Sequence, residues 1–423
     1  MLRKILFFLL LINSISLCTS KEELKKRIEN ILAKVPDQTV SAIIVFNPQT
    51  QDTIFSENAS DTVIPASNTK LFTTATALNL MGSDFVLSTK ILSVARVRNG
   101  VLNGNLYIKG YGNSVFTEQD LIEMVKELKN KGIKEITGNV IGDDSYFDED
   151  YSRDDWINDE LTDYRLPPVS ALVLDRNRTA VRERVRVRVA RRRYRIKYIT
   201  VYKDVSNPPL FVAQALRAEL VRNGIRVTGM AEKGITPNNA GTLAESTILL
   251  KDLIKIMDKH SDNFLAECLF KTIGAVSTGK QGNAFYSTQA VMRFIKDNGI
   301  FSKGTSLVDG SGLSRYDLVT VGAIGGVLEK MYFDQKNYKD FYNALSIAGV
   351  DGTLRYRMSG TPAENNFHGK TGTLNGVSSL SGYLKLANGN DLIISIVFQY
   401  RNQGAYYYRE IENEIVTSLS EWK

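Results

Sequence analysis

The chain has 423 residues, 43% of them hydrophobic and 23% charged, which is ordinary for globular protein and long enough for about two to three domains. Its two histidines, His260 and His368, lie far apart, which argues against a zinc site because such sites need about three or four clustered ligands. The net charge of +7 does not describe a generally basic surface. Residues 176–197 hold eleven basic residues and Glu183 as their one acid, so they contribute +10 and the rest of the chain −3.

The first twenty residues have the features of a secretory signal peptide. Two basic residues precede an apolar run at residues 5–12, and small residues follow, so we expect cleavage after Ser20 and export to the periplasm or cell envelope. The run is too short to span a bilayer. Cys18 does not predict a lipoprotein, because Leu17 stands where a small residue is expected. After cleavage Cys268 is the one remaining cysteine, which excludes an internal disulfide.

The spacing of apolar residues predicts the elements that follow. A helix is expected from Lys21 to Val35, and then a hairpin of strands 39–46 and 53–55 around the turn at residues 47–50. From about Phe85 short strands and Gly/Asn turns predominate. The further elements expected before residue 143 are the helix that begins near Ser67, strands within 101–108, a helix over 117–131 and a strand near 133–141.

An arginine tract dominates the middle of the chain, after an acidic and irregular stretch at residues 143–170. Within the tract every second residue is an arginine, at Arg184, Arg186 and Arg188, and the residues between them are valines. A period of two predicts a strand with one wholly basic face. The elements expected after the tract are helices over 210–223, 249–257, 263–273 and 285–297, strands over 367–373, 378–386 and 391–400, and a final helix over 405–419, with a boundary loop at 236–242.

Ser67 and Lys70 form the candidate catalytic pair. Pro65 before small residues, followed by an apolar run, predicts a helix with Ser67 in its first turn. Residues three apart on a helix are neighbours, so the Lys70 amine can take the proton of the Ser67 hydroxyl. The helix N-terminus adds partial positive charge where an oxyanion would develop. The same Ser-x-x-Lys pattern at residues 277–280 and 420–423 lacks this helix entry signal.

Two motifs follow the pair in a fixed order, Ser261-Asp262-Asn263 and then Lys370-Thr371-Gly372. Either motif alone could be a helix cap or a turn. With Ser67 and Lys70, on a helix, a helix junction and a strand, they make the set of motifs found in class A β-lactamases and penicillin-binding proteins. Residues 309–315 include a Gly-Ser-Gly sequence, but Asp309 replaces the first glycine of a nucleophile elbow, so we interpret them as a tight turn.

Over nearly its whole mature length the chain resembles the class C low-molecular-mass penicillin-binding proteins, the D-alanyl-D-alanine carboxypeptidase/endopeptidase family. That family places extra domains between its first two motifs, and here 194 residues separate Ser67 from Ser261. The blocks that resemble the family are Ile64–Leu71, Lys259–Asn263, Asp309–Arg315 and His368–Thr373, with Gly142–Ser145, Pro168–Leu172 and Asp175–Asn177 in the insert.

The resemblance implies an α/β fold, the serine β-lactamase/DD-peptidase-like sandwich. In this fold helices pack on an antiparallel sheet beside a helical subdomain. The implied division of the chain is a signal peptide at 1–20, an N-terminal part with the nucleophile helix at 21–84, a mainly β insert at 85–240 and a C-terminal part at 241–423.

The resemblance also implies a role for each motif residue. Ser67 is expected to be the acylated nucleophile and Lys70 its general base. Ser261 is expected to relay protons to the leaving group, and Asn263 to bond the substrate amide.

The last motif is expected to bind the end of the substrate. Lys370, with Thr371, Gly372 and Thr373, would hold the terminal carboxylate and shape the oxyanion hole with backbone N–H groups. Because Lys70 must be neutral to act as a base, we expect the second cation at Lys370 to lower the pKa of Lys70.

The implied function is cleavage of peptidoglycan stem peptides at D-Ala bonds through an acyl-enzyme, without metal or cofactor, and with β-lactams as covalent inhibitors. Carboxypeptidase and endopeptidase activity both remain open, because both cut next to D-Ala. One alternative is a β-lactamase, but the deacylating Glu-x-x-Leu-Asn loop is missing and its nearest counterpart, residues 267–270, is in a predicted helix. The other alternative is a catalytically silent envelope-binding protein. The intact motif set argues against it, because a protein that only binds has no structural need for all of these residues.

The basic tract allows two interpretations. Its arginines can form a solvated face whose partners are acidic residues of the same chain, such as Asp148, Glu149 and Asp150. Alternatively, Arg184, Arg186 and Arg188 make an electrostatic contact with an anionic envelope polymer. Nucleic acid is not an expected partner of an exported protein.

Overall fold

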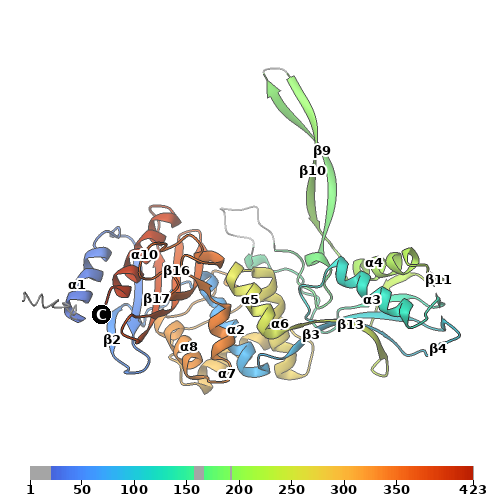
Figure 1. Cartoon of the computed structure of the whole chain (residues 1–423), viewed down its shortest axis with the longest axis horizontal. Helices are drawn as coiled ribbons and strands as arrows, with labels where there is room; N and C mark the ends of the chain where they lie inside the picture. The colour runs from blue at the N-terminus through green and yellow to red at the C-terminus, as the bar shows by residue number, and fades with distance from the viewer. Residues whose placement is uncertain (1–20, 157–165, 191–192, 423) are drawn as a thin grey trace, which may run out of the picture.

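The computed structural model describes residues 21–156, 166–190 and 193–422 (Figure 1). The predicted signal peptide, with Cys18 and its cleavage site, lies outside the described residues. Among the helices of the described ranges, none combines the length and apolar character needed to cross a membrane.

A six-stranded sheet forms the centre of the larger part, with the strand order β14-β15-β16-β17-β1-β2. All of its pairs are antiparallel. The predicted hairpin and the three predicted C-terminal strands are confirmed. The bounds are β1 Val40–Phe46, β2 Thr53–Glu57, β14 Ser346–Ile347, β15 Phe367–Leu374, β16 Val377–Lys385 and β17 Asp391–Gln399.

Both faces of this sheet are buried, which explains why its strands β1 and β17 are apolar at most positions. Ile43 and Val45 of β1 pack with helices α1 (Lys21–Leu32) and α10 (Ala405–Ser420), whereas Ala42 and Phe46 face the helical layer on the other side. Successive residues of a strand point to opposite faces, so one short strand joins the two cores. The result is the expected sandwich, with α1 and α10 on one side (Figure 1).

The helical layer surrounds α2, which is buried on all sides and carries apolar or small residues around its circumference. Helix α2 packs against α6, α7 and α8. Helices α8 and α9 lie in a region where no element was predicted. The bounds of the layer are α2 Thr69–Met81, α5 Leu250–His260, α6 Asn263–Thr278, α7 Ala284–Asp297, α8 Val321–Phe333 and α9 Tyr338–Ala344, with a 3₁₀ turn, η4, at Gly352–Leu354.

Apart from β9 (Arg178–Ala190) and β10 (Arg193–Asp204), the described residues of the inserted region form two small sheets, ordered β12-β8-β6-β3-β13 and β11-β7-β5-β4, with helices α3 and α4. The division of the chain at residues 84 and 240 stays a prediction, and β13, just beyond it, pairs with β3 of the insert. The bounds are β3 Val86–Ser93, β4 Val97–Arg98, β5 Val101–Leu102, β6 Leu106–Tyr111, α3 Glu118–Asn130, β7 Glu135–Ile136, β8 Val140–Asp143, η2 Asp154–Trp156, α4 Pro208–Arg222, β11 Arg226–Val227, β12 Ala231–Lys233 and β13 Gly241–Leu249.

The arginine tract forms a separate two-stranded antiparallel ribbon that projects away from the body (Figure 1). Its strands are β9 (Arg178–Ala190) and β10 (Arg193–Asp204). The predicted strand is therefore confirmed. Arg184 pairs with Tyr198 and Arg186 with Ile196, so the basic side chains of β9 share their face with aromatic and aliphatic side chains of β10.

Candidate active site

Ser67 lies in a 3₁₀ turn, η1 (Ala66–Asn68), that leads directly into α2. The sequence predicted the first turn of the α-helix, and the structure places the serine one short turn earlier. Lys70, in the first turn of α2, brings its Nζ to 2.9 Å from the Ser67 Oγ. Ala66, just before the nucleophile, has a φ of 49°, a left-handed conformation that is strained for a residue with a Cβ.

The nucleophile turn is fixed against the central sheet. The Ser379 Oγ donates to the Pro65 carbonyl at 2.8 Å, and the Asn68 Nδ2 donates to the Ser381 Oγ at 3.1 Å. Strand β15 runs so close to the turn that a Cβ on Gly372 would lie 2.9 Å from the Ser67 backbone nitrogen and 2.2 Å from the Ser379 Oγ. Gly372 is thus required by this close approach, which brings the third motif next to the first.

The Lys70 ammonium is buried and has three hydrogen-bond acceptors: the Ser67 Oγ at 2.9 Å, the Asn263 Oδ1 at 2.6 Å and the Ser311 carbonyl at 2.6 Å. Burial lowers the pKa of Lys70 to about 8, against the opposing attraction of Asp309 and other buried carboxylates. We expected the cation at Lys370 to cause this shift, and that expectation was wrong. The lysine is cut off from water by the core, and desolvation penalises its charge most.

Lys370 and Ser261 form a second pair next to the first. The Lys370 Nζ donates to the Ser261 Oγ and to the Thr371 carbonyl, each at 2.8 Å. Burial, followed by repulsion from Lys70, holds the pKa of Lys370 well below its ordinary value. Ser261 joins α5 to α6 in a left-handed conformation with a φ of 54°. The predicted serine and lysine of the second and third motifs are therefore in direct contact.

The middle residue of the second motif connects the site to the inserted region. Asp262 caps α6 by accepting from the Leu265 N–H at 3.1 Å. Its two carboxylate oxygens also accept from the Arg176 guanidinium at 2.6 and 3.0 Å, and that guanidinium lies 4.9 Å from the centre of the Phe264 ring. Arg176 belongs to the 3₁₀ turn η3 (Asp175–Asn177), in which all three residues have a positive φ. Sequence reasoning assigned no role to Arg176.

The turn at residues 309–315 supplies the carbonyl that holds Lys70. The buried Asp309 carboxylate accepts from the backbone N–H groups of Ser311, Gly312 and Ser314 at 2.7–3.1 Å, which fixes the turn from inside. A Cβ on Gly312 would lie 1.9 Å from the Ala66 carbonyl, and its φ is 79°, so this turn also needs glycine to pack under the nucleophile. The tight turn is confirmed, and it has a positioning role that the sequence did not indicate.

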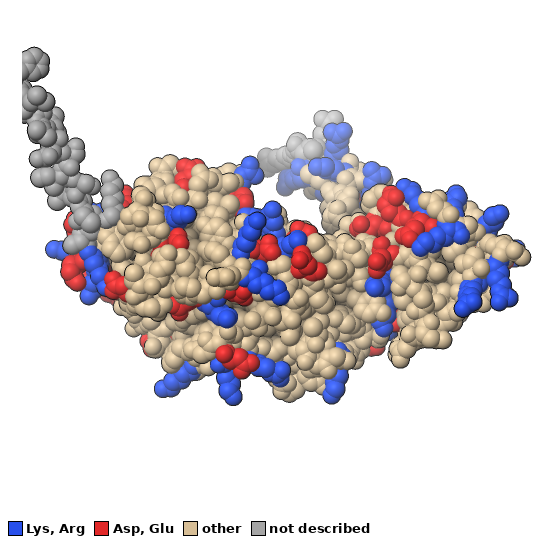
Figure 2. All heavy atoms as spheres, turned by 60° about the horizontal axis from the view of Figure 1, so that its bottom comes forward, with Lys and Arg blue, Asp and Glu red and all other residues tan. Residues whose placement is uncertain are grey.

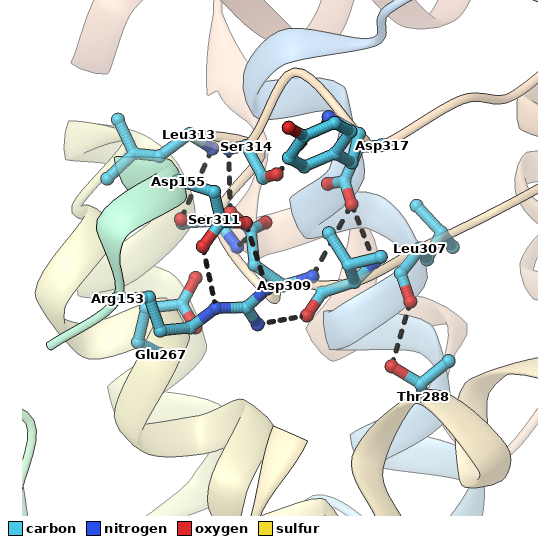
Figure 3. Close-up of polar contacts among 12 residues, drawn as sticks. Arg153, Asp155, Glu267, Thr288, Leu307, Asp309, Ser311, Leu313, Ser314 and Asp317 are labelled. Atoms are coloured by element: carbon cyan, nitrogen blue, oxygen red, sulfur yellow. Dashed lines mark hydrogen bonds and ion pairs between the residues drawn. The ribbon is translucent and has the colours of Figure 1, made fainter. Parts of the chain in front are cut away.

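Further buried polar groups lie behind this turn (Figure 3). The Glu267 carboxylate accepts from the Gly310 N–H at 3.0 Å, and burial together with the neighbouring Asp309 raises the pKa of Glu267 to about 8. Arg153 forms a two-point ion pair with Asp155 at 2.9 and 2.8 Å and also donates to the Val308 carbonyl. Glu267 is therefore engaged with the backbone of the turn.

A cleft of about 570 Å³ opens over the motif residues, and Ser67, Ser261, Asn263, Thr371 and Thr373 contribute to its walls. Sequence reasoning missed the other residues of the lining, because they come from segments far from the motifs. These are Thr353, Tyr356, Arg357, Tyr406, Arg409 and Glu410.

Arg409 is the most informative residue of this missed set. Its Nη2 donates to the Thr373 Oγ1 at 3.0 Å, so a guanidinium stands beside the threonine that was predicted to bind substrate. Two residues earlier on strand β15, the Thr371 Oγ1 donates to the Thr353 Oγ1 at 2.8 Å. The Arg409 guanidinium and the two threonine hydroxyls therefore lie on the cleft wall, and the buried Lys370 reaches this wall through Ser261. Such a set of donors suits a carboxylate.

Three comparisons with known proteins agree with this geometry. The profile of the D-Ala-D-Ala carboxypeptidase 3 (S13) family matches residues 24–190 and 192–421. The chain is 28% identical to the D-alanyl-D-alanine carboxypeptidase DacB of Haemophilus influenzae over 414 residues, which covers 86% of each protein. It is also 28% identical to the D-alanyl-D-alanine carboxypeptidase of Actinomadura sp., and this match covers 89% of this chain and 80% of that one. The crystal structure of penicillin binding protein 4 from H. influenzae superposes with a TM-score of 0.80 at 26% identity, covering 93% of this chain and 98% of that one.

Proposed function

The chain belongs to the D-Ala-D-Ala carboxypeptidase 3 (S13) family, and we propose that it performs this family's serine peptidase reaction with Ser67 as the acylated residue. One observation supports this most directly. Two of the three acceptors around the Lys70 Nζ, the Asn263 Oδ1 and the Ser311 carbonyl, can only accept hydrogen bonds. In neutral Lys70 the two remaining N–H bonds are therefore directed at them, and the lone pair is left facing the Ser67 hydroxyl.

The acylation step follows from this arrangement. The Ser67 Oγ attacks the carbonyl carbon of the penultimate D-Ala while its proton moves to neutral Lys70. The carbon–nitrogen bond to the terminal residue then breaks, and the departing amine receives the proton that Lys70 took up, relayed through Ser261, which lines the cleft and contacts Lys370. Water later attacks the ester, which releases the shortened peptide and restores the Ser67 hydroxyl.

We assign carboxylate recognition to the cationic end of the cleft. Lys370, Thr371, Thr373 and Arg409 would hold the substrate carboxylate next to the bond that is cut, and Asn263 would use its amide N–H₂ on the substrate because its oxygen is engaged by Lys70. The substrates would be peptidoglycan stem peptides outside the cytoplasm, and β-lactams would acylate the same serine. The signal peptide at 1–20 remains a prediction.

The lifetime of the penicillin adduct tests this function. We expect trapping with a labelled penicillin, followed by mass spectrometry, to give one adduct on Ser67 that hydrolyses slowly. Glu267, the glutamate of the nearest sequence counterpart to the class A deacylation loop, is buried and accepts from the Gly310 N–H, so it does not present a base to a water in the cleft. Turnover of many β-lactam molecules per second would instead identify a resistance enzyme.

The acylation rate should depend on pH through Lys70. The base is the neutral amine, and burial lowers the pKa of Lys70 to about 8. The second-order rate constant for penicillin acylation should therefore rise with pH, by about tenfold per unit below 8, and level off above it. Stopped-flow measurement with a penicillin that does not titrate between pH 6 and 9 checks this, and a flat profile across that range would contradict the assigned base.

A further inference from the structure

The β9–β10 ribbon is the largest feature of the molecule that the peptidase reaction leaves unexplained. Its strands hold 13 and 12 residues, which corresponds to about 40 Å of extended chain. The two strands pair with each other and, among the described strands, with no other strand. A ribbon of this kind is only marginally stable in water when nothing covers it. Its length therefore calls for a binding partner.

One face of the ribbon combines guanidinium groups with exposed rings. Arg184, Arg186 and Arg188 are exposed on β9. Directly opposite, on β10, lie residues that are 48–63% exposed although they are apolar or aromatic: Tyr198, Ile196 and Tyr194. The Arg186 guanidinium lies 4.4 Å from the centre of the Tyr194 ring, which keeps the ring and the cation together on the surface. Figure 2 shows basic side chains gathered on the ribbon, which rises behind the body.

Two of the acidic residues that could pair with these arginines are engaged elsewhere. Asp148 pairs with Lys271 at 2.5 Å, and Glu149 with Lys233 at 2.8 Å.

Within the ribbon, Glu183 pairs with Lys203 and Asp204 with Arg178, at 2.8 and 2.7 Å. Over the described part of the chain, no salt bridge reaches the three arginines of the exposed face. Asp148 and Glu149 are therefore not the partners of these arginines, and the charge of this face is open to solvent or to a partner outside the chain.

The base of the ribbon is attached to the catalytic centre. Strand β9 begins two residues after Arg176, and the Arg176 guanidinium binds both carboxylate oxygens of Asp262. Asp262 is the middle residue of the motif that supplies Ser261 and Asn263. A long polymer that lies along the ribbon would therefore pass close to the cleft at one end.

We propose that this ribbon is a docking site for the polymeric substrate itself, a linear glycan strand whose stem peptides carry free carboxylates. This inference rests on the proposed function. Arginines at alternate positions recur about every 6.6 Å along the strand, a row suited to successive anionic groups of a linear polymer, and guanidinium groups bind carboxylates by two hydrogen bonds. The tyrosine rings offer flat apolar surfaces to sugar rings.

Two other occupants fit the ribbon less well. A lipid bilayer would have to receive the exposed arginines of this face, Arg184, Arg186 and Arg188, and three charges are costly to bring into hydrocarbon. A second copy of the chain would place one arginine row against another, and the like charges would repel.

The test compares a polymeric and a short substrate. In the triple variant R184Q/R186Q/R188Q we expect D-Ala release from purified sacculi to fall by about tenfold at low salt, with hydrolysis of a soluble pentapeptide and penicillin acylation unchanged. Raising the salt should slow the wild type on sacculi and leave the triple variant unaffected. The matched control is R293Q/K296Q/K303Q, which removes three exposed cations from the body and should behave like the wild type.

Binding is measured separately, so that a failure of the docking proposal is distinguishable from a failure of the proposed function. Each triple substitution is combined with Ser67→Ala and sedimented with sacculi, a readout that needs no catalysis. Equal binding and equal D-Ala release by the ribbon variant and the wild type would overturn the proposal. So would binding of the ribbon to phosphatidylglycerol vesicles in place of sacculi, or a change of oligomeric state in the ribbon variant. If the wild type released no D-Ala from either substrate while its sedimentation depended on the ribbon, the proposed function would fail and the docking site would stand.

Discussion

Replacing Ser67 with alanine should abolish both covalent labelling by penicillin and release of D-alanine from peptides. The hydroxyl is the one nucleophile that the cleft places 2.9 Å from the Lys70 amine, and alanine removes it without enlarging the side chain. The turn that carries it is held by the backbone of Pro65 and by Asn68, so the fold should survive. Gel fluorography with a fluorescent penicillin and intact-protein mass spectrometry measure the adduct directly.

The chain provides a matched control for this substitution. Ser277 and Lys280 have the same spacing as the catalytic pair, but the Ser277 hydroxyl donates to the Gly274 carbonyl at 3.1 Å near the end of α6. Ser277→Ala should label with penicillin like the wild type. A Ser67→Ala protein that still forms a stoichiometric adduct would falsify the assignment of the nucleophile.

Sequence reasoning could single out the motif residues because the evidence for them is local. The spacing of Ser67 and Lys70, and the alternation within β15, β16 and β17, depend on the backbone geometry of one helix or strand. The order of the three motifs then identified the family. The structure brings Ser67, Lys70, Ser261, Asn263 and Lys370 into one site, although their roles are still to be tested by experiment.

What the sequence did not reveal depends on contacts between distant segments. The Ser311 carbonyl reaches Lys70 because Asp309 folds the backbone around its own carboxylate, and nothing in the local pattern predicts where that carbonyl points. Arg409 joins the cleft from the last helix for the same reason. The absence of a prediction for α8 has a different cause. Its three glycines lower helix propensity, but Gly325 and Gly326 allow close packing against Phe46 and Ile300.

The expected cause of the Lys70 shift was wrong for an instructive reason. A nearby like charge can be read from a motif, whereas complete burial is known only when the fold is seen. In this molecule burial is the largest cause of the lowered pKa of both lysines, and repulsion from Lys70 lowers the pKa of Lys370 further. The core around α2 therefore lowers the pKa of Lys70, the proposed base, to about 8.

Replacing Lys70 with arginine should reduce penicillin acylation by about 10²–10⁴-fold, the range that a general base contributes. Arginine keeps the positive charge but is not deprotonated in a protein, so the site would hold a permanent donor where it needs a lone pair. The loss should not be recovered by raising the pH, in contrast to the wild type. Stopped-flow acylation between pH 6 and 10, with circular dichroism to verify folding, measures both effects.

Because Lys70 is fully buried, a larger guanidinium could also disturb packing, and two further variants separate these causes. Lys271 is another buried lysine, paired with Asp148 at 2.5 Å outside the cleft, so Lys271→Arg tests the effect of the same enlargement without touching the base. Lys70→Met removes the amine without adding volume. If the rate fell only in the two Lys70 variants, the proton-accepting role would be supported. If Lys271→Arg fell equally, the enlargement alone would account for the loss in Lys70→Arg. If Lys70→Met acylated at the wild-type rate, Lys70 would not be the base, because a general base has to be lost with its nitrogen.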